Sequence, residues 1–205
     1  MDIIKYFQTG GFFMYPILFV LACGIAISLE RIIFLTRTQS RTNKVWSQLV
    51  PMLKANDYAR AVKLTETAKT PLATMLTYGF ARHSANKRRE IIEAAMEEGM
   101  MDVMPDLEQR THYLATLANI ATLLGLLGTI IGLISAFDAV AGADPAQKAE
   151  LLSGSISVAM YTTSFGLIAA IPLLLVHSFL VTKTARLVDT LEMAAVKTLN
   201  IMIRD

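Results

Sequence analysis

The sequence predicts an all-α membrane protein with three transmembrane helices, of which the second and third extend into a helical cytoplasmic domain. Of the 205 residues, 54% are apolar and only 18% are charged, and the mean hydropathy is +0.47. Asp, Glu, Lys and Arg are absent from three long stretches, residues 12–29, 111–137 and 151–182. Because about 17 to 25 apolar residues cross the hydrocarbon of a bilayer, each stretch is long enough to form one span.

Residues 1–36 are expected to form a short periplasmic stub and the first transmembrane helix. The apolar run is longer than the hydrophobic region of a secretory signal, and it continues directly into Glu30-Arg31. No Ala-x-Ala cleavage site follows it. We therefore expect this helix to stay in the membrane.

Residues 37–110 are predicted to form a helical cytoplasmic segment. Leu49 and Leu53 belong to a run of apolar residues at helical spacing. Asn56-Asp57 marks a break in which Asp57 caps the next helix, and Thr70-Pro71 begins a further one. The segment is therefore expected to contain several helices.

The second and third spans, within residues 111–182, are predicted to be long helices joined by a short periplasmic loop. A helix from Lys87 is expected to lead into the second span, with a kink or an end at Pro105. Residues 183–205 continue the helical pattern of the third span as a C-terminal cytoplasmic helix.

The basic residues predict the orientation. Residues 31–110 contain 13 of the 19 Lys and Arg, whereas residues 138–150 contain one Lys against three acids. Since basic residues favour the cytoplasmic side, the N-terminus is predicted to be periplasmic and the C-terminus cytoplasmic.

Small residues recur in the second span, in the motif GLLGTIIGLISAF. Gly125, Gly128 and Gly132 are three and four residues apart, so they share one helix face and let another backbone come close. Thr129 lies at the edge of this face. A Thr hydroxyl in a helix commonly bonds the carbonyl four residues earlier, so Thr129 taken alone is interpreted as structural.

The third span has a similar face around the motif TTSFGLIAAIP, which begins at Thr162. Ala159, Thr162 and Gly166 share one side of the helix. Thr163 lies beside them, and Pro172 frees a backbone carbonyl one turn earlier. Hydroxyls and freed carbonyls can bind ions, but closely packed membrane helices contain them as well. Taken alone, this face favours packing over an ion pathway.

Several function classes are disfavoured. The spans contain no charged residue, so if protons cross here the acid must come from a partner. The segment GLLGT lacks the Lys and the preceding strand of a phosphate-binding loop, and His and Cys lack metal-ligand spacing. The net charge of +2 gives no reason to expect nucleic acid. We expect a protein in contact with membrane lipid that is not an enzyme and has no cofactor or bound metal.

The chain resembles the MotA/TolQ/ExbB family of ion-channel subunits, and most closely its ExbB and TolQ branch. The likeness extends over essentially the whole chain: the Glu-Arg in LERIIFL after the first span, the helical segment that follows, GLLGTIIGLISAF, and TTSFGLIAAIP. The last two motifs are specific when they occur together.

The resemblance implies a homopentamer in the bacterial inner membrane, which surrounds a dimer of a single-span partner of the ExbD, TolR or MotB kind. An Asp in the partner's membrane helix would carry the transported H⁺ or Na⁺, and ion flow would drive work at the cell envelope. By position, Thr129 and Thr163 match the family's two pore-lining threonines. The expected ion pathway is Thr129, Thr163 and Thr162, and the residues expected to pack helices and line the pore are Gly125, Gly128, Gly132, Ala159, Gly166 and Pro172.

Two positions depart from the family. Many ExbB and TolQ proteins have Glu five residues before the third-span Thr, where this chain has Val158, and many have Pro where it has Thr122. The missing acid counts against proton handling by this subunit. This chain resembles sodium-driven flagellar stator subunits in having adjacent threonines, Thr162-Thr163. Neutral oxygens such as theirs suit Na⁺. H⁺ is kept ahead of Na⁺.

Three functions are therefore compared. The first is a stator subunit that couples proton or sodium motive force to mechanical work by the partner, as in biopolymer transport or envelope energisation. The second is a passive helical membrane scaffold or assembly factor, in which the same small residues only hold subunits together. The third, the membrane half of an ATP-driven transporter, would need a cytoplasmic helix that docks an ATPase.

Overall fold

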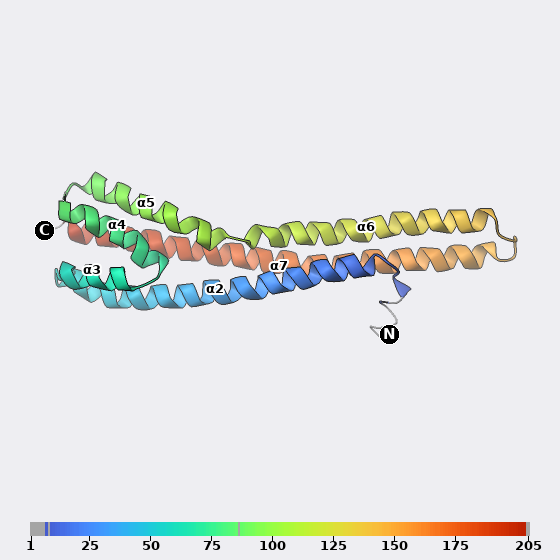
Figure 1. Cartoon of the computed structure of the whole chain (residues 1–205), viewed down its shortest axis with the longest axis horizontal. Coiled ribbons are helices and arrows are strands. Elements are labelled where there is room, and N and C mark those ends of the chain that lie inside the picture. The colour runs from blue at the N-terminus through green and yellow to red at the C-terminus, as the bar shows by residue number, and fades with distance from the viewer. Residues whose placement is uncertain (1–6, 8, 86, 204–205) are drawn as a thin grey trace. The chain divides into compact units, whose positions relative to one another are not determined.

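The computed structural model describes residues 7, 9–85 and 87–203, and within them it contains helices and no strand (Figure 1). Three helical stretches are long and apolar enough to cross a membrane: Met14–Lys54, Arg89–Ala141 and Lys148–Met202. The predicted fold class is thus confirmed. The helices are α2 (Met14–Lys54), α3 (Tyr58–Thr67), α4 (Pro71–Ala85), α5 (Arg89–Glu108), α6 (Thr111–Ala141) and α7 (Lys148–Met202).

The chain divides into two compact units. The first, here called the span unit, contains the residues up to Glu30 and Arg110–Phe179. The second, called the bundle unit, contains Arg31–Gln109 and the residues from Leu180 onward. Helices α2 and α7 contribute to both units, because each continues without interruption past the end of its apolar stretch.

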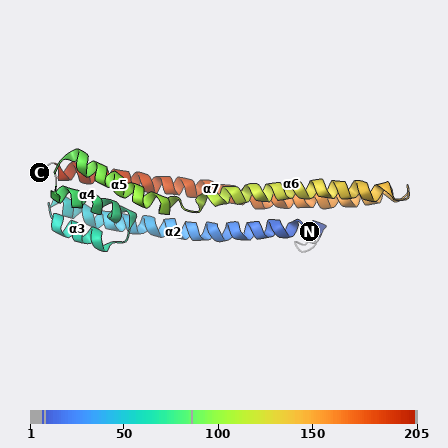
Figure 2. The same ribbon diagram turned by 45° about the horizontal axis from the view of Figure 1, so that its top comes forward.

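In the span unit, α6 and the first part of α7 form an antiparallel hairpin, and the two helices run side by side in both views (Figures 1 and 2). The first part of α2 packs against α7, since a Cβ atom built on Gly24 would meet the side chain of Leu173. Large apolar side chains point outward along all three helices, among them Phe19, Leu123 and Leu175. Such a surface suits lipid and not water.

In the bundle unit, the buried side chains are mostly large and apolar, as in a water-soluble helical domain. Leu49, Leu72 and Ile92 are completely buried in it. Helix α3 begins at the predicted break, where the carboxylate of Asp57 accepts a hydrogen bond from the backbone N–H of Arg60 at 3.2 Å. This confirms Asp57 as an N-cap, an interaction that typically stabilises a helix by about 1 kcal/mol.

The helix that leads into the second span breaks later than Pro105. Helix α5 contains Pro105 and ends at Glu108, and Arg110 then adopts a left-handed backbone conformation with φ of 61°. Of the two outcomes expected at Pro105, a helix end is wrong by three residues, and a kink there stays a prediction. A proline removes the hydrogen bond of its own N–H and its ring crowds the carbonyl four residues earlier, which can kink a helix without ending it, whereas a left-handed residue turns the chain out of the helix.

Helix α2 shows a continuity that the sequence pattern did not reveal. It runs for 41 residues from Met14 to Lys54, so the first span also extends into the bundle unit. The prolines of this helix are Pro16, in its first turn, and Pro51, in its last turn. With nothing to break the hydrogen-bond ladder at Glu30, the helix continues beyond the apolar stretch.

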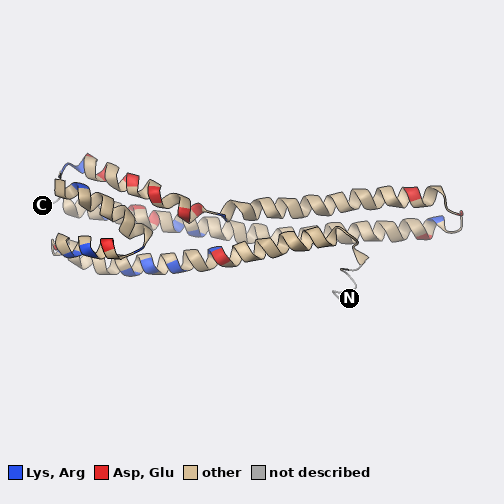
Figure 3. Ribbon diagram, viewed as in Figure 1, with Lys and Arg blue, Asp and Glu red and all other residues tan. Residues whose placement is uncertain are grey.

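Charges are concentrated in the bundle unit (Figure 3). At the edge of the span unit, a guanidinium nitrogen of Arg110 lies 3.6 Å from a carboxylate oxygen of Glu30. Both side chains are about half exposed, so this ion pair contributes little to stability.

Candidate ion pathway

Two of the three predicted pathway threonines meet directly at the contact between α6 and α7. The hydroxyls of Thr129 and Thr163 are hydrogen bonded to each other. The carbonyl oxygen of Gly125 lies 3.2 Å from the Thr129 hydroxyl and 3.0 Å from the Thr163 hydroxyl, so it can accept from either. Both side chains are half-buried. We call Thr129 and Thr163 the threonine pair.

Glycines allow the two helices to come this close. A Cβ atom added to Gly125 would lie 3.2 Å from the Cα of Thr163, and one added to Gly166 would lie 2.8 Å from the carbonyl oxygen of Ala121. Backbone atoms cannot move aside as a flexible side chain can. The threonine pair therefore depends on the absence of side chains at Gly125 and Gly166.

The same contact continues along the hairpin through the other predicted small residues. A Cβ on Gly132 would be 2.9 Å from the Cβ of Ala159, and a Cβ on Gly128 would collide with the side chain of Thr162. In lipid, no hydrophobic force drives helices together, because lipid tails are as apolar as the side chains. Contacts between small residues favour helix association instead, because they let the two backbones pack closely. Five predicted small residues thus lie on one helix contact, and whether they also line a pore stays a prediction.

Thr162 and Thr163 are neighbours in sequence but have different surroundings. Thr162 is only 2% exposed, and its hydroxyl donates to the carbonyl oxygen of Gly10 at 2.7 Å, with that of Val158 also 3.0 Å away. It ties α7 to the segment before α2. Of the two, only Thr163 belongs to the threonine pair, whereas Thr162 has the position of a packing residue within one chain.

Pro172 is not part of this group. It lies inside α7 and is exposed, nine residues and therefore about 13 Å along the helix from Thr163. The carbonyl that it leaves without a helical partner belongs to Ile168, whose side chain is also exposed. The structure thus separates Pro172 from the threonine pair.

The two positions that depart from the family pattern lie at different places. Val158 is half-buried near the segment before α2, 3.4 Å from the Cβ that would be built on Gly11. Thr122 is exposed on α6, and its hydroxyl donates to the carbonyl oxygen of Ala118 at 3.1 Å. Such a bond within one helix needs no neighbour, so Thr122 is a suitable control position for the threonine pair.

Arg31 follows the first apolar stretch, directly after Glu30, and its guanidinium is buried. The side chain is 1% exposed, donates to the carbonyl oxygens of Asp106 and Leu107, and lies over the ring of Phe34. A cation at the last carbonyls of α5 is favoured by the helix dipole. The only signal in the sequence was the Glu-Arg that directly follows an apolar span.

The chemistry available around the threonine pair is that of neutral oxygens. The hydroxyls of Thr129 and Thr163 and the carbonyls of Gly125 and Ala159 lie together, in spans without Asp, Glu, Lys or Arg. Among the described residues, no group of His, Cys, Asp and Glu side chains is arranged to hold a metal ion. These oxygens can coordinate a cation or donate to an acid, but they cannot themselves hold a transported proton.

Comparison with known proteins gives a consistent match. The sequence model of the MotA/TolQ/ExbB proton channel family matches residues 67–193, which include both threonines of the pair. A protein of Synechocystis sp., named as an ExbB-like biopolymer transport protein, is 29% identical over 82% of this chain and 80% of its own length. An ExbB homologue of Methanothermobacter thermautotrophicus is 26% identical over 93% of this chain and 67% of its own length. The Tol-Pal system protein TolQ of Haemophilus influenzae is 36% identical over 41% of this chain and 36% of TolQ.

Proposed function

The chain belongs to the MotA/TolQ/ExbB proton channel family, and we propose that it is a stator subunit that couples ion flow to mechanical work. In this proposal, five copies in the bacterial inner membrane surround a dimer of a single-span partner of the ExbD or TolR kind. An Asp in the partner's membrane helix takes up and releases the ion. A potential of 100 mV supplies about 2.3 kcal/mol per elementary charge, so a few ions are enough to drive a motion of the partner.

The observation that carries the proposal is the threonine pair. Thr129 and Thr163 come from different helices and reach each other in the middle of two apolar spans. A pair of hydroxyls can donate to a carboxylate when it is charged and accept from it when it is protonated. Thr129 and Thr163 are therefore assigned to face the partner's Asp, with Thr162 holding the backbone behind them.

The proposed topology follows the distribution of charge. The bundle unit, with most of the Lys and Arg, is assigned to the cytoplasm together with the C-terminus, and the N-terminus and the loop between α6 and α7 to the periplasm. The proposed division is residues 1–36 for the periplasmic stub and first span, 37–110 for the cytoplasmic segment, 111–182 for the second and third spans, and 183–205 for the C-terminal helix.

Thr163→Val tests the role of the pair, because valine keeps the shape of threonine and removes the hydroxyl. We expect assembly to persist and ion flux, measured in proteoliposomes that contain the partner, to fall by at least about tenfold, as the loss of a hydrogen bond to a charged group would cause. Thr163→Ser should retain flux. Thr122→Val is the matched control, since it removes a hydroxyl from an exposed position in the same membrane unit. Full flux in Thr163→Val would remove the proposed role.

A passive scaffold is the second candidate, and one observation favours it. The hydroxyls of the threonine pair already have carbonyl partners within the hairpin, at Gly125 and Ala159. In a scaffold, the whole role of the two threonines would be to hold α6 and α7 together through these bonds. This candidate predicts no ion flux through the complex with its partner, and Thr163→Val would then weaken the α6–α7 contact without any effect on transport.

The identity of the ion is tested by ion replacement. Neutral oxygens alone are compatible with either H⁺ or Na⁺, so the chemistry of the pair does not decide between them. H⁺ remains the first choice, and it predicts that flux at fixed potential is unchanged when Na⁺ is replaced by a larger cation. Flux that requires Na⁺ would reverse the order.

A further inference from the structure

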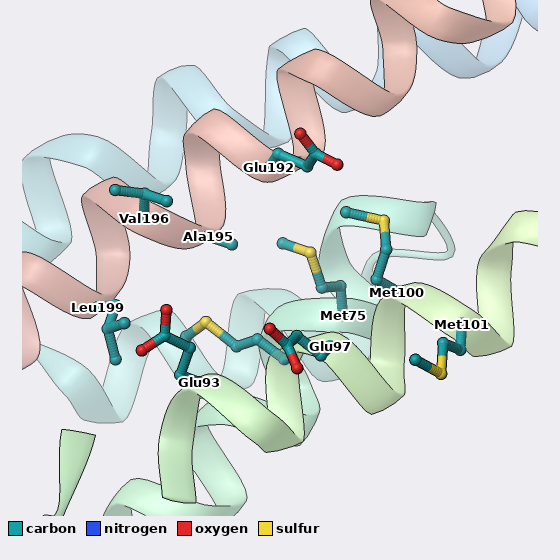
Figure 4. Close-up of a pocket in the computed structure, with 10 residues that line it drawn as sticks. Met75, Glu93, Glu97, Met100, Met101, Glu192, Ala195, Val196 and Leu199 are labelled. Carbon is teal, nitrogen blue, oxygen red and sulfur yellow. The ribbon is translucent and has the colours of Figure 1, made fainter. Parts of the chain in front are cut away.

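The bundle unit contains a groove that the ion pathway does not use. It lies between α5 and the last part of α7 and has a volume of about 340 Å³ (Figure 4). Methionine side chains line its interior and three carboxylates lie along it. The residues that define this acidic groove are Met75, Met100, Met101, Glu93, Glu97 and Glu192.

Both the apolar and the acidic parts of the groove are open. Met101 is 73% exposed and Val196 is 51% exposed, so apolar surface is open on both helices that form the groove. Glu93 has Arg89 as an ion-pair partner at 3.6 Å. Among the residues that the structure describes, Glu97 and Glu192 have no ion pair within 4.0 Å. Methionine adapts its shape to different partners, so such a groove suits a protein surface.

The same unit has a face of opposite charge on another helix. The part of α2 from Arg31 to Lys54 contains no Asp or Glu, and Arg37, Arg41 and Lys44 are exposed along it. These three residues are four and three positions apart, so they form one stripe on the helix. None of them has an ion pair in the described part of the chain. We call them the basic stripe.

Acidic and basic residues are strongly segregated between these two helices. Helix α5 has seven acids against a single Arg, whereas the charged residues in the last part of α2 are all basic. Figure 3 shows the red positions on α5 and the blue positions on α2 on separate helices of the bundle unit. A chain with two complementary faces at different places can bind a copy of itself head to tail, an arrangement that forms a ring when the rotation between successive copies closes.

We propose that the acidic groove binds the basic stripe of a neighbouring copy of this chain. The inference rests on the proposed function, in which copies form a ring, and it adds the faces through which their bundle units meet. The aliphatic stems of Arg37, Arg41 and Lys44 would cover the methionines, and their charged groups would pair with the carboxylates of Glu97 and Glu192.

The dimensions of the two faces agree. The acidic groove extends along α5 from Glu93 to Met101, eight residues or about 12 Å of helix. The basic stripe extends from Arg37 to Lys44, seven residues or about 10 Å. One stripe therefore covers one groove, and neither face is left with a long uncompensated end.

Cross-linking of introduced thiols tests the contact in the full chain within native-like membranes. Cys23 is the single cysteine, so Cys23→Ser gives a background without thiols. With a short bismaleimide linker, Glu97→Cys combined with Arg41→Cys should form cross-linked dimers and higher species, at least about tenfold more than either single variant. The linker is needed because two residues that pair through long side chains lie too far apart for a direct disulfide, and only the double variant places two thiols across the contact. An equally strong ladder from Glu66→Cys with Arg41→Cys, or no ladder from the intended pair in an assembled complex, would overturn the proposal.

Charge reversal supplies the second measurement. Glu97→Lys should weaken self-association by about tenfold, since it places like charges across the contact, and Glu97→Lys with Arg41→Glu should restore it. Glu66→Lys, an exposed reversal on α3, is the matched control and should leave assembly unchanged. If Arg41→Glu alone weakens binding to anionic vesicles and does not rescue Glu97→Lys, the basic stripe binds lipid and the proposed contact is wrong.

These measurements are independent of ion transport. Thr163→Val should leave the cross-linked ladder intact even where it abolishes flux. A complex that shows the ladder but no flux would refute the proposed function and keep the contact. A complex that shows flux but neither ladder nor rescue would refute the contact and keep the function.

Discussion

The two units of the chain are packed by side chains of opposite size. In the bundle unit, the completely buried residues are large, such as Leu49, Leu72 and Leu76. Between α6 and α7 of the span unit, the contact is made by glycine, alanine and threonine, and the bulky residues point outward, as Ile130 and Leu175 do.

The solvent of each unit explains the difference. In water, a large apolar side chain gains about 1.5–3 kcal/mol on burial, so a bundle is stabilised by the leucines that it hides. In lipid the surroundings are as apolar as leucine itself, so burial gains little and close backbone contact takes over. The bundle unit is therefore expected to be most sensitive to substitutions that make a buried side chain smaller. The α6–α7 contact is expected to be most sensitive to substitutions that make a side chain larger.

The largest effect is expected from Leu76→Ala in the bundle unit. Leu76 is completely buried in α4, and shortening a buried leucine to alanine typically costs about 2–5 kcal/mol. Hydrogen–deuterium exchange should accelerate in α4 and α5 and stay unchanged in the hairpin of α6 and α7. Arg82→Ala, an exposed change on the same helix, should shift the stability by less than about 0.5 kcal/mol. Equal acceleration in the hairpin would mean that the two units unfold as one.

A smaller effect is expected from Arg31→Met, which preserves much of the buried volume and removes the charge. The hydrogen bonds to Asp106 and Leu107 are lost, and bonds to a charged group are typically worth about 1.5–3 kcal/mol. Exchange should accelerate most at the end of α5. The control is Arg60→Met, whose side chain is 79% exposed in its pair with Asp57. A response no larger than that of the control would show that Arg31 is only an interfacial anchor.

Much of this organisation could be predicted from the sequence, because it depends on local patterns. The three spans follow from stretches without charge, the N-cap at Asp57 from its place before a helical pattern, and the small-residue contact from the spacing of glycines such as Gly125 and Gly128. Each of these signals lies within a few turns of the chain. The glycines lie on the α6–α7 contact, and their assignment as packing and pore-lining residues stays a prediction.

What the sequence did not reveal depends on contacts between distant residues. Arg31 reaches carbonyls 75 and 76 positions later, and the different surroundings of Thr162 and Thr163 depend on Gly10 and Gly125. The left-handed backbone at Arg110 has no signature residue such as glycine. A periodic pattern reports which face of a helix is apolar, but not which neighbour that face meets.

The smallest expected effect tests the span unit with one added methyl group at two glycines of α7. Gly166→Ala places a Cβ 2.8 Å from the carbonyl oxygen of Ala121, so the helices must separate, at a typical cost of about 1–3 kcal/mol. A Cβ on Gly154 meets nothing within 4 Å, and alanine is the better helix former by up to about 1 kcal/mol, so Gly154→Ala should be neutral or stabilising. Hydrogen–deuterium exchange of α6 and α7 in lipid nanodiscs measures both. Opposite signs for the same chemical change would establish that close contact, and not apolar burial, holds the hairpin together; equal small effects would show that the α6–α7 contact tolerates expansion and that the contrast between the units is weaker than we infer.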